Sequence, residues 1–216
     1  MRFPGVTLVL LLAPLGVQAR TPRPFDVLCR EAWGAGKAAG PYVRHQVKHL
    51  TVHHSGVALG DNRRAPRRIL SAQRYHQRRG WPDIAYHFLV DRAGNIYEGR
   101  PVRVRGDTGT RYDTTGHFLV CLVENHDEQP VLPRQLDALV NLLAWASARH
   151  EVSPAAIRGH GQLARTSCPG KKLRALIDDG TITRRVRQTL AAGGVRLRGV
   201  CGAEGKRHVA AIRRGR

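Results

Sequence analysis

Residues 158–170, RGHGQLARTSCPG, constrain the fold of this chain more than any other segment does. They place one imidazole, His160, and one thiol, Cys168, on a loop marked by glycine and proline. Cys sulfur and His nitrogen are zinc ligands, and a catalytic zinc takes three protein ligands and leaves its fourth position for water or substrate. The best third donor lies far upstream, in residues 50–56, where an apolar, β-branched run ends in two adjacent histidines. Successive strand side chains point to opposite faces, so only one of the two can enter a given pocket.

Spacing alone leaves a second interpretation open, because a loop histidine and a lone cysteine are often a surface imidazole and a small packed thiol. The surrounding sequence adds four ordered motifs. They are VHHS at 52–55, YH at 75–76 followed by GWPDIAYHF at 80–88, GNIYEGR at 94–100, and GH at 159–160 followed by CPG at 168–170. With these motifs the chain resembles the zinc-dependent N-acetylmuramoyl-L-alanine amidases, a family that includes phage lysozyme-type amidases and peptidoglycan recognition proteins. The resemblance runs from about Arg30 to about Leu176.

The resemblance implies an α/β fold, a single domain with a central mixed β-sheet flanked by helices, as in amidases and peptidoglycan recognition proteins. It also implies that Zn²⁺ is held by His53, His160 and Cys168. In the family the first residue of the His-x-Ser/Thr pattern is the ligand, so His53 is chosen over His54. On the opposite strand face, His54 is left for packing or for a hydrogen bond to a ligand.

Two further positions match catalytic positions of the family. The pattern Gly-Trp-x-Asp-x-x-Tyr places Tyr86 beside the metal-bound water. Attack on an amide builds an oxyanion, and a phenol hydroxyl near zinc can orient the water or donate to that charge. Thr166 stands two residues before the metal cysteine, where phage enzymes have Lys and recognition-type enzymes have Thr.

The chain also departs from the family pattern. Some cytosolic branches carry a glutamate that acts as general base where this chain has Cys121. Family members commonly show Gly-Ala-His before an Asn-containing loop that lines the substrate groove, whereas this chain reads GDT at 106–108 and DTTG at 113–116. Glu124 either reaches the groove or caps a strand. The resemblance therefore implies the metal site more strongly than any particular contact to glycan or stem peptide.

The function implied is zinc-dependent hydrolysis of the amide bond between N-acetylmuramic acid and L-alanine of peptidoglycan. The alternative is a peptidoglycan-binding recognition module without turnover. In the family, members that only bind lack one zinc ligand, most often the cysteine, and Cys168 is present here. The substrate partner is therefore peptidoglycan or a muropeptide, and the family is commonly monomeric.

The N-terminus predicts export. Residues 1–19 carry basic Arg2, an apolar core over 6–15 and the small-residue exit VQA at 17–19, which together are typical of a secretory signal peptide. The apolar run is too short to span a bilayer comfortably, and no transmembrane segment is expected. We expect a periplasmic or secreted protein.

Charge adds a second partner class. The 216 residues contain 36 Lys+Arg against 16 Asp+Glu, a formal net charge of +20. For an exported protein the available polyanions include cell-wall polymers, and simple solubility of the surface is the alternative. No basic motif interleaved with aromatic residues is present, so nucleic acid is not expected as a partner.

Four cysteines remain to be assigned. If Cys168 binds metal, Cys29, Cys121 and Cys201 are left. Paired thiols persist as disulfides in an oxidising compartment, and Cys29 and Cys201 flank the domain, so this pair is favoured. Cys121 lies within an apolar strand pattern and is expected to be a small buried residue.

Periodicity predicts the elements between these motifs. Strands are expected in 42–57, 84–90, 96–98 and 117–124, and helices over 67–79, 132–150, 173–177 and 182–192. Residues 105–115 are expected to be a loop, and residues 21–24 to be disordered. The predicted organisation is a signal peptide at 1–19, an N-terminal segment at 20–41, a zinc amidase domain at 42–192 and a basic C-terminal tail at 193–216. Of that tail, the part from Gly202 onward is expected to be free.

Overall fold

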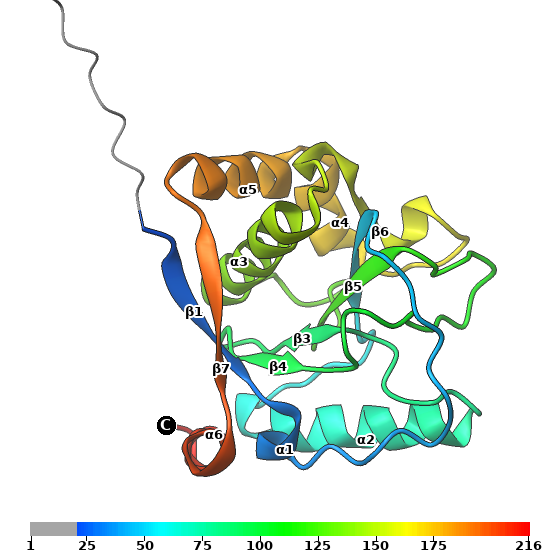
Figure 1. Ribbon diagram of the computed structural model, residues 1–216, viewed down its shortest axis with the longest axis vertical. Coiled ribbons are helices and arrows are strands. Elements are labelled where there is room, and N and C mark those ends of the chain that lie inside the picture. Colours follow the sequence, from blue (N-terminus) through cyan, green and yellow to red (C-terminus); the bar gives the residue numbers. More distant parts are fainter. Residues whose placement is uncertain (1–20) are drawn as a thin grey trace, which may run out of the picture.

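The computed structural model describes residues 21–216, so the predicted signal peptide lies outside the described residues. One mixed sheet has the strand order β6-β2-β5-β3-β4-β1-β7 (Figure 1). The strands are β1 (Arg23–Leu28), β2 (His49–His54), β3 (Phe88–Val90), β4 (Ile96–Glu98), β5 (His117–Leu122), β6 (Ile157–Gly159) and β7 (Val195–Val200). The α-helices are α1 (Arg30–Trp33), α2 (Ala65–Arg78), α3 (Pro133–His150), α4 (Lys171–Asp178), α5 (Thr181–Ala191) and α6 (Gly202–Arg213). Short 3₁₀ turns cover Asn62–Arg64, Pro154–Ala156 and His160–Gln162.

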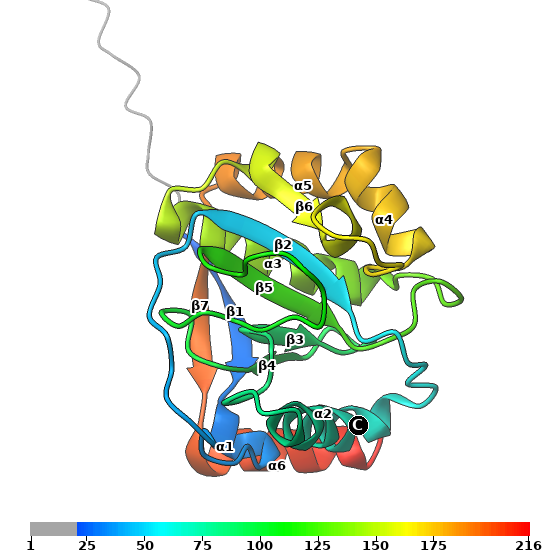
Figure 2. The same ribbon diagram turned by 90° about the vertical axis from the view of Figure 1, so that its right-hand side faces the viewer.

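Helices cover both faces of the sheet, which confirms the predicted fold class. Helices α3, α4 and α5 lie on one face, and α1, α2 and α6 lie on the other (Figure 2). Among residues 21–216, no helix combines the length and apolarity needed to cross a bilayer.

Strand β5 lies inside the sheet between β2 and β3, and all six of its residues are buried. It pairs in parallel with β2 and β3, and its two faces lie in the two cores that the helices cover, which explains the apolar run from Phe118 to Leu122. Alternation divides its side chains between two cores. Phe118 and Val120 join the core under α3 to α5. Cys121 joins the core under α1, α2 and α6, as a small buried residue as predicted.

The same alternation in β2 sets the orientation of the histidines. Leu50 and Val52 belong to the core on the α3 side. His53 is the register partner of Cys121 on β5 and so lies on the α2 side of the sheet. Strand β6 pairs with the other edge of β2, with Gly159 opposite Val52, and this pairing brings the chain to His160.

The predicted helices are present with boundaries close to those expected. Helix α2 ends just before Gly80, whose φ of 85° is a conformation that glycine adopts without strain. Helix α3 begins at Pro133, a residue well suited to the first helical position because it lacks the N–H that would be unpaired there. Residues 105–115 form no regular element, as expected.

The two chain ends differ from expectation. Strand β1 begins at Arg23, within the segment expected to be disordered, and pairs along its length with β7. The prediction of a free segment from Gly202 onward is wrong, because α6 packs against α1 and buries Val209 and Ile212. The approach is close: a Cβ on Gly205 would lie 2.4 Å from the carbonyl oxygen of Val200. In the sequence of α6 the apolar residues recur at helical spacing, but basic residues surround them, so the apolar face of this helix is hard to recognise.

The disulfide prediction is confirmed. Cys29 at the end of β1 is bonded to Cys201 at the end of β7, with a Cα–Cα distance of 5.0 Å. Trp33 of α1 is fully buried, and its indole N–H donates to the carbonyl of Glu98. The disulfide bond therefore joins the ends of β1 and β7, both of which lead into packed helices.

Candidate active site

Strands β2 and β6 bring together the three residues that were predicted from the sequence to be metal ligands. One donor atom each from His53, His160 and Cys168 lies within 4.8 Å of the others. The Sγ atom of Cys168 is 3.6 Å from Nδ1 of His53. Within residues 21–216 one other cluster of possible ligands meets this limit, but two of its members are the disulfide-bonded Cys29 and Cys201.

Glycines allow the loop to fold back so that His160 meets Cys168. Gly161 donates its N–H to the carbonyl of Cys168 at 2.7 Å. A Cβ on Gly161 would lie 2.8 Å from that same oxygen, so no larger residue fits without movement. Gly159 is equally close to Pro169, at 2.9 Å from its Cδ. The glycine and proline signals of the sequence thus reflect close approach of backbone to backbone.

The electrostatics of the cluster suit a metal ion. Burial lowers the pKa of His160 to about 4 and that of His53 well below its usual value, so both rings are neutral and carry a free lone pair. Burial also raises the pKa of the Cys168 thiol to about 12. A bound cation reverses that effect, since a coordinating thiol is deprotonated outright. Two neutral imidazoles and one thiol at the edge of a cavity fit the three-ligand pattern of a catalytic zinc.

His54 points to the other side of β2. Its Nδ1 accepts a hydrogen bond from the backbone N–H of His126 at 3.1 Å, and the two rings are stacked with centroids 6.3 Å apart. Its backbone N–H lies 3.5 Å from the Sγ atom of Cys168. The ring therefore contributes to packing, while its backbone contacts the candidate ligand.

Tyr86 stands beside the ligand cluster. Its ring centroid is 5.3 Å from that of His53. Burial raises the pKa of Tyr86 well above its usual value, so the hydroxyl stays protonated, and it makes a side-chain hydrogen bond with Cys121. Thr166 has a different position: its Oγ1 accepts from the backbone N–H of Cys168 at 3.2 Å and fixes the turn that presents the thiol.

A cavity of about 220 Å³ opens onto these groups. His76 and Trp81 form part of its wall, with ring centroids 4.9 Å apart. Nδ1 of His76 accepts from the backbone N–H of Ala85 at 3.1 Å, so in the neutral ring the proton is on Nε2. A second cavity of about 390 Å³ runs along α2 and shares His76 and Tyr86 with the first.

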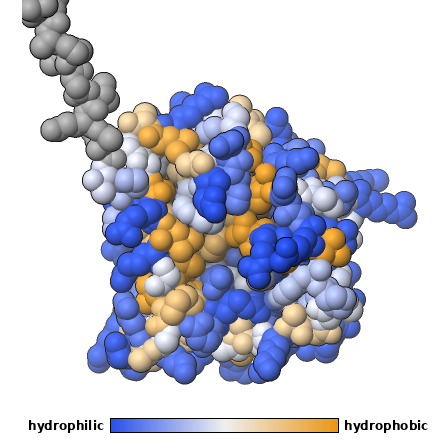
Figure 3. Space-filling model, viewed as in Figure 1, coloured by the Kyte–Doolittle hydropathy of each residue, from blue (hydrophilic) through white to orange (hydrophobic). Residues whose placement is uncertain are grey.

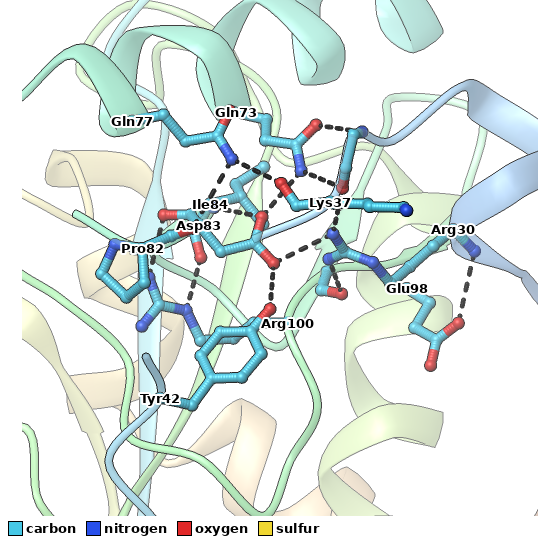
Figure 4. A network of polar contacts seen from close by, with 12 residues as sticks. Arg30, Lys37, Tyr42, Gln73, Gln77, Pro82, Asp83, Ile84, Glu98 and Arg100 are labelled. Carbon is cyan, nitrogen blue, oxygen red and sulfur yellow. Dashed lines mark hydrogen bonds and ion pairs between the residues drawn. The ribbon is translucent and has the colours of Figure 1, made fainter. Parts of the chain in front are cut away.

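A network of polar contacts holds the segment that carries Trp81 and Tyr86 (Figure 4). The buried carboxylate of Asp83 accepts from Tyr42, Gln73 and its neighbour's backbone N–H, and pairs with Arg30 at 2.9 Å. Burial opposes ionisation of Asp83, but hydrogen bonds from Tyr42 and Gln73 outweigh it and lower its pKa. The aspartate of the Gly-Trp-x-Asp-x-x-Tyr pattern therefore has a structural role here.

Three residues on the 105–115 loop reach the ligand cluster and were not identified from the sequence. The hydroxyl of Thr108 is 3.4 Å from Nε2 of His160. The hydroxyl of Thr110 is 2.7 Å from Nε2 of His160, and that of Tyr112 is 3.4 Å from Nε2 of His53. The loop has no periodicity of apolar residues, and its sequence differs from the family pattern. Only its polar composition indicated that its residues could lie at a functional site.

Glu124 has no place in the cavity wall. Its Oε1 accepts from the backbone N–H groups of Leu59 and Asn125, and its Oε2 lies 3.6 Å from Arg92. The carboxylate thus organises the chain after β5, which corresponds to the capping alternative.

Comparison with known proteins identifies the family of the chain. Residues 43–171 match the family described as N-acetylmuramoyl-L-alanine amidase. Peptidoglycan-recognition protein LB of Drosophila melanogaster is 32% identical over 171 residues, covering 76% of this chain and 72% of that protein. A mutant of Drosophila PGRP-LB in complex with tracheal cytotoxin superposes with a TM-score of 0.63 at 27% identity, covering 70% of this chain and 92% of that one. The amidase LysC from Clostridium intestinale shares the fold, with a TM-score of 0.58 at 21% identity and coverage of 82% and 100%. The chain belongs to the N-acetylmuramoyl-L-alanine amidase family.

Proposed function

We propose that this protein is a zinc-dependent hydrolase that cleaves the amide bond between N-acetylmuramic acid and L-alanine of peptidoglycan. The observation that carries the proposal is the convergence of His53, His160 and Cys168 within 4.8 Å, in a chain that belongs to an amidase family. The family includes both catalytic amidases and non-catalytic recognition proteins. The complete donor set favours the catalytic class.

The chain's residues have distinct roles in this proposal. His53, His160 and Cys168 hold the zinc, which when bound supplies a water of lowered pKa and polarises the substrate carbonyl. The protonated hydroxyl of Tyr86 donates to the oxygen on which negative charge develops. Thr166 keeps the Cys168 backbone in place through its hydrogen bond. Trp81 and His76 shape the wall against which the substrate lies.

Partner and location follow from the same assignment. A PGRP-LB mutant is described in complex with tracheal cytotoxin, and we propose a peptidoglycan or muropeptide ligand for this chain as well. Export to a periplasmic or secreted location is supported by the N-terminal sequence and by the Cys29–Cys201 disulfide, since such bonds persist in oxidising compartments.

The test is metal content followed by product analysis. Purified residues 20–216 are expected to contain about one zinc per chain, and Cys168→Ala or His160→Ala is expected to lose metal and activity together, since two protein ligands bind zinc far more weakly. Mass analysis of products from a defined muropeptide identifies the bond that is cut. Full activity in a zinc-free Cys168→Ala protein would contradict the proposal.

The binding module is the second candidate, favoured by the recognition proteins among the relatives. It predicts that the zinc-loaded protein sediments with purified wall but releases no peptide. Release of free stem peptide from the same wall rules it out.

A further inference from the structure

The candidate ligands are themselves held by the 105–115 loop. Each histidine has two ring nitrogens, and in each ring Nε2 faces a hydroxyl of this loop. Thr110 Oγ1 lies 2.7 Å from Nε2 of His160, and the Tyr112 hydroxyl lies 3.4 Å from Nε2 of His53. In both rings Nδ1 is left for another partner, and that of His53 faces the Sγ atom of Cys168 at 3.6 Å.

Hydrogen bonds within the loop allow Thr110 to act as the acceptor for His160, and Thr108 Oγ1 lies 3.4 Å from the same Nε2. Thr108 Oγ1 accepts from the backbone N–H of Thr110 at 3.2 Å and lies 2.9 Å from the Thr110 hydroxyl. When Thr110 gives its single hydroxyl proton to Thr108, its oxygen is left to accept from Nε2–H of His160. The proton of the neutral ring is then on Nε2, and Nδ1 carries the lone pair that a metal requires.

Tyr112 is positioned to accept a hydrogen bond from Nε2–H of His53 in the same way. Its ring is packed between two imidazoles, with centroids 5.2 Å from His160 and 5.2 Å from His117. Burial raises the pKa of Tyr112 above its ordinary value, so its hydroxyl is that of a neutral phenol. A neutral phenol oxygen can accept from Nε2–H of His53.

The loop is anchored to the interior. The fully buried guanidinium of Arg100 donates to the carbonyl of Arg105 and to the carboxylate of Asp107, each at 2.6 Å. The same group donates to the carbonyls of Asp83 and Ile84, within the network of Figure 4. A Cβ on Gly106 would lie 2.4 Å from the side chain of Leu119, so the loop rests directly on β5.

We propose that Thr110 and Tyr112 are positioning residues that fix the tautomer and ring orientation of His160 and His53 for zinc. The inference rests on the zinc site proposed above. Metal-bound histidines almost always donate their second ring N–H to an outer partner, and loss of such a partner typically costs 10- to 100-fold in metal affinity. Here those partners come from the 105–115 loop, whose sequence departs from the family pattern.

Zinc affinity, measured by competition with a chelator, tests the proposal in the full mature chain. Thr110→Val and Tyr112→Phe are each expected to weaken zinc binding by about 10- to 100-fold, the range for an outer partner. Thr110→Ser keeps the hydroxyl and is expected to bind as the wild type does. Thr115→Val, in the same loop, and Tyr75→Phe, on α2, are matched controls expected to leave affinity unchanged, because neither side chain contacts a candidate ligand.

A second measurement reports on the tautomer without metal or turnover. In the metal-free protein, ¹⁵N NMR of the imidazoles is expected to show His160 protonated on Nε2 in the wild type and in Thr110→Ser, and a mixture of tautomers in Thr110→Val. Absence of zinc binding by the wild type would overturn the proposed zinc site itself. Wild-type zinc binding together with unchanged affinity and unchanged tautomer in Thr110→Val and Tyr112→Phe would overturn this inference alone.

Discussion

Tyr86 is the residue at which donation to the substrate can be separated from metal binding. Its ring lies beside His53, but it is not a member of the ligand cluster. Tyr86→Phe is therefore expected to retain zinc and to lower turnover by about one to three orders of magnitude, the scale for loss of one transition-state donor. Metal analysis and turnover of one muropeptide are measured on the same preparation. Unchanged turnover would leave Tyr86 with a packing role.

The adjacent histidines provide a second residue-scale test. His53→Ala is expected to lose the metal, whereas His54→Ala is expected to keep it, because the two rings lie on opposite faces of β2 and His54 bonds to the backbone of His126. Zinc content of the two purified variants distinguishes them. Retention of zinc by His53→Ala would show that the register assigned to the ligand strand is wrong.

How far the site was predictable depends on where its residues lie. His53, His160 and Cys168 end strands or lie in glycine-marked turns, so pattern and family resemblance nominate them together. Thr110 and Tyr112 lie in a loop whose path is set by Arg100 and by contact with β5, neither of which leaves a local pattern. The contacts of Thr110 and Tyr112 with the histidines therefore depend on tertiary structure and cannot be read from the local sequence.

At the scale of elements, α6 shows how a short apolar stripe can be hidden by charge. Ile212 is 4% exposed, while its neighbour Arg213 is exposed. Ile212→Ala is expected to destabilise the protein by about 2–4 kcal/mol, within the range for truncating a buried isoleucine, and Arg213→Ala by less than about 0.5 kcal/mol. Urea unfolding at fixed zinc concentration measures both. Equal midpoints would mean that α6 does not contribute to the core.

The central elements were predictable for a physical reason. Strand β5 has a continuous apolar run and is buried at every residue, and helix α3 has apolar residues at helical spacing that form its buried face. Strand β7 is an edge strand with alternating basic residues, and β1 is a short segment next to it; the two strands pair along their whole length. Pairing between the start and the end of a chain is not visible in a local window.

For the whole molecule, the net charge of +20 favours association with polyanions. Hydrophilic residues cover much of the face seen in Figure 3, around scattered apolar ones.

Because α6 is folded, the charges of its exposed basic side chains can be removed by substitution while the helix itself is kept. The triple variant Lys206→Gln, Arg207→Gln, Arg213→Gln is expected to sediment less with anionic wall at low salt, and to match the wild type at high salt, where screening shortens the Debye length to about 3 Å at 1 M. Hydrolysis of a small soluble muropeptide is the control. Equal sedimentation at every salt concentration would contradict wall adhesion by these charges.

Buried histidines make the whole molecule sensitive to acid. Burial lowers the pKa of His87 to about 3 and that of His76 and His117 to about 4, all below the ordinary value of 6.5. Between those values the unfolded chain binds protons that the folded chain does not, so stability is lost as pH falls from about 6.5 toward 4. Each such histidine contributes up to about 1.4 kcal/mol per pH unit. The urea midpoint of the metal-free protein is expected to fall steadily between pH 7 and pH 4.5. A constant midpoint would contradict neutral burial of these rings.

The pairing of β1 with β7 has a consequence for the order in which the chain can fold as it emerges. Strand β1 lies between β4 and β7, so one of its two neighbours is made of residues 195–200, near the opposite end of the sequence. Contacts between residues so distant in sequence form late and slow folding. In the proposed export, Cys29 would reach the oxidising side before Cys201, with Cys121 and Cys168 emerging in between. Early pairing of Cys29 with Cys168 would occupy a proposed zinc ligand, so an oxidoreductase able to exchange such bonds would determine how much of the chain could bind the proposed zinc.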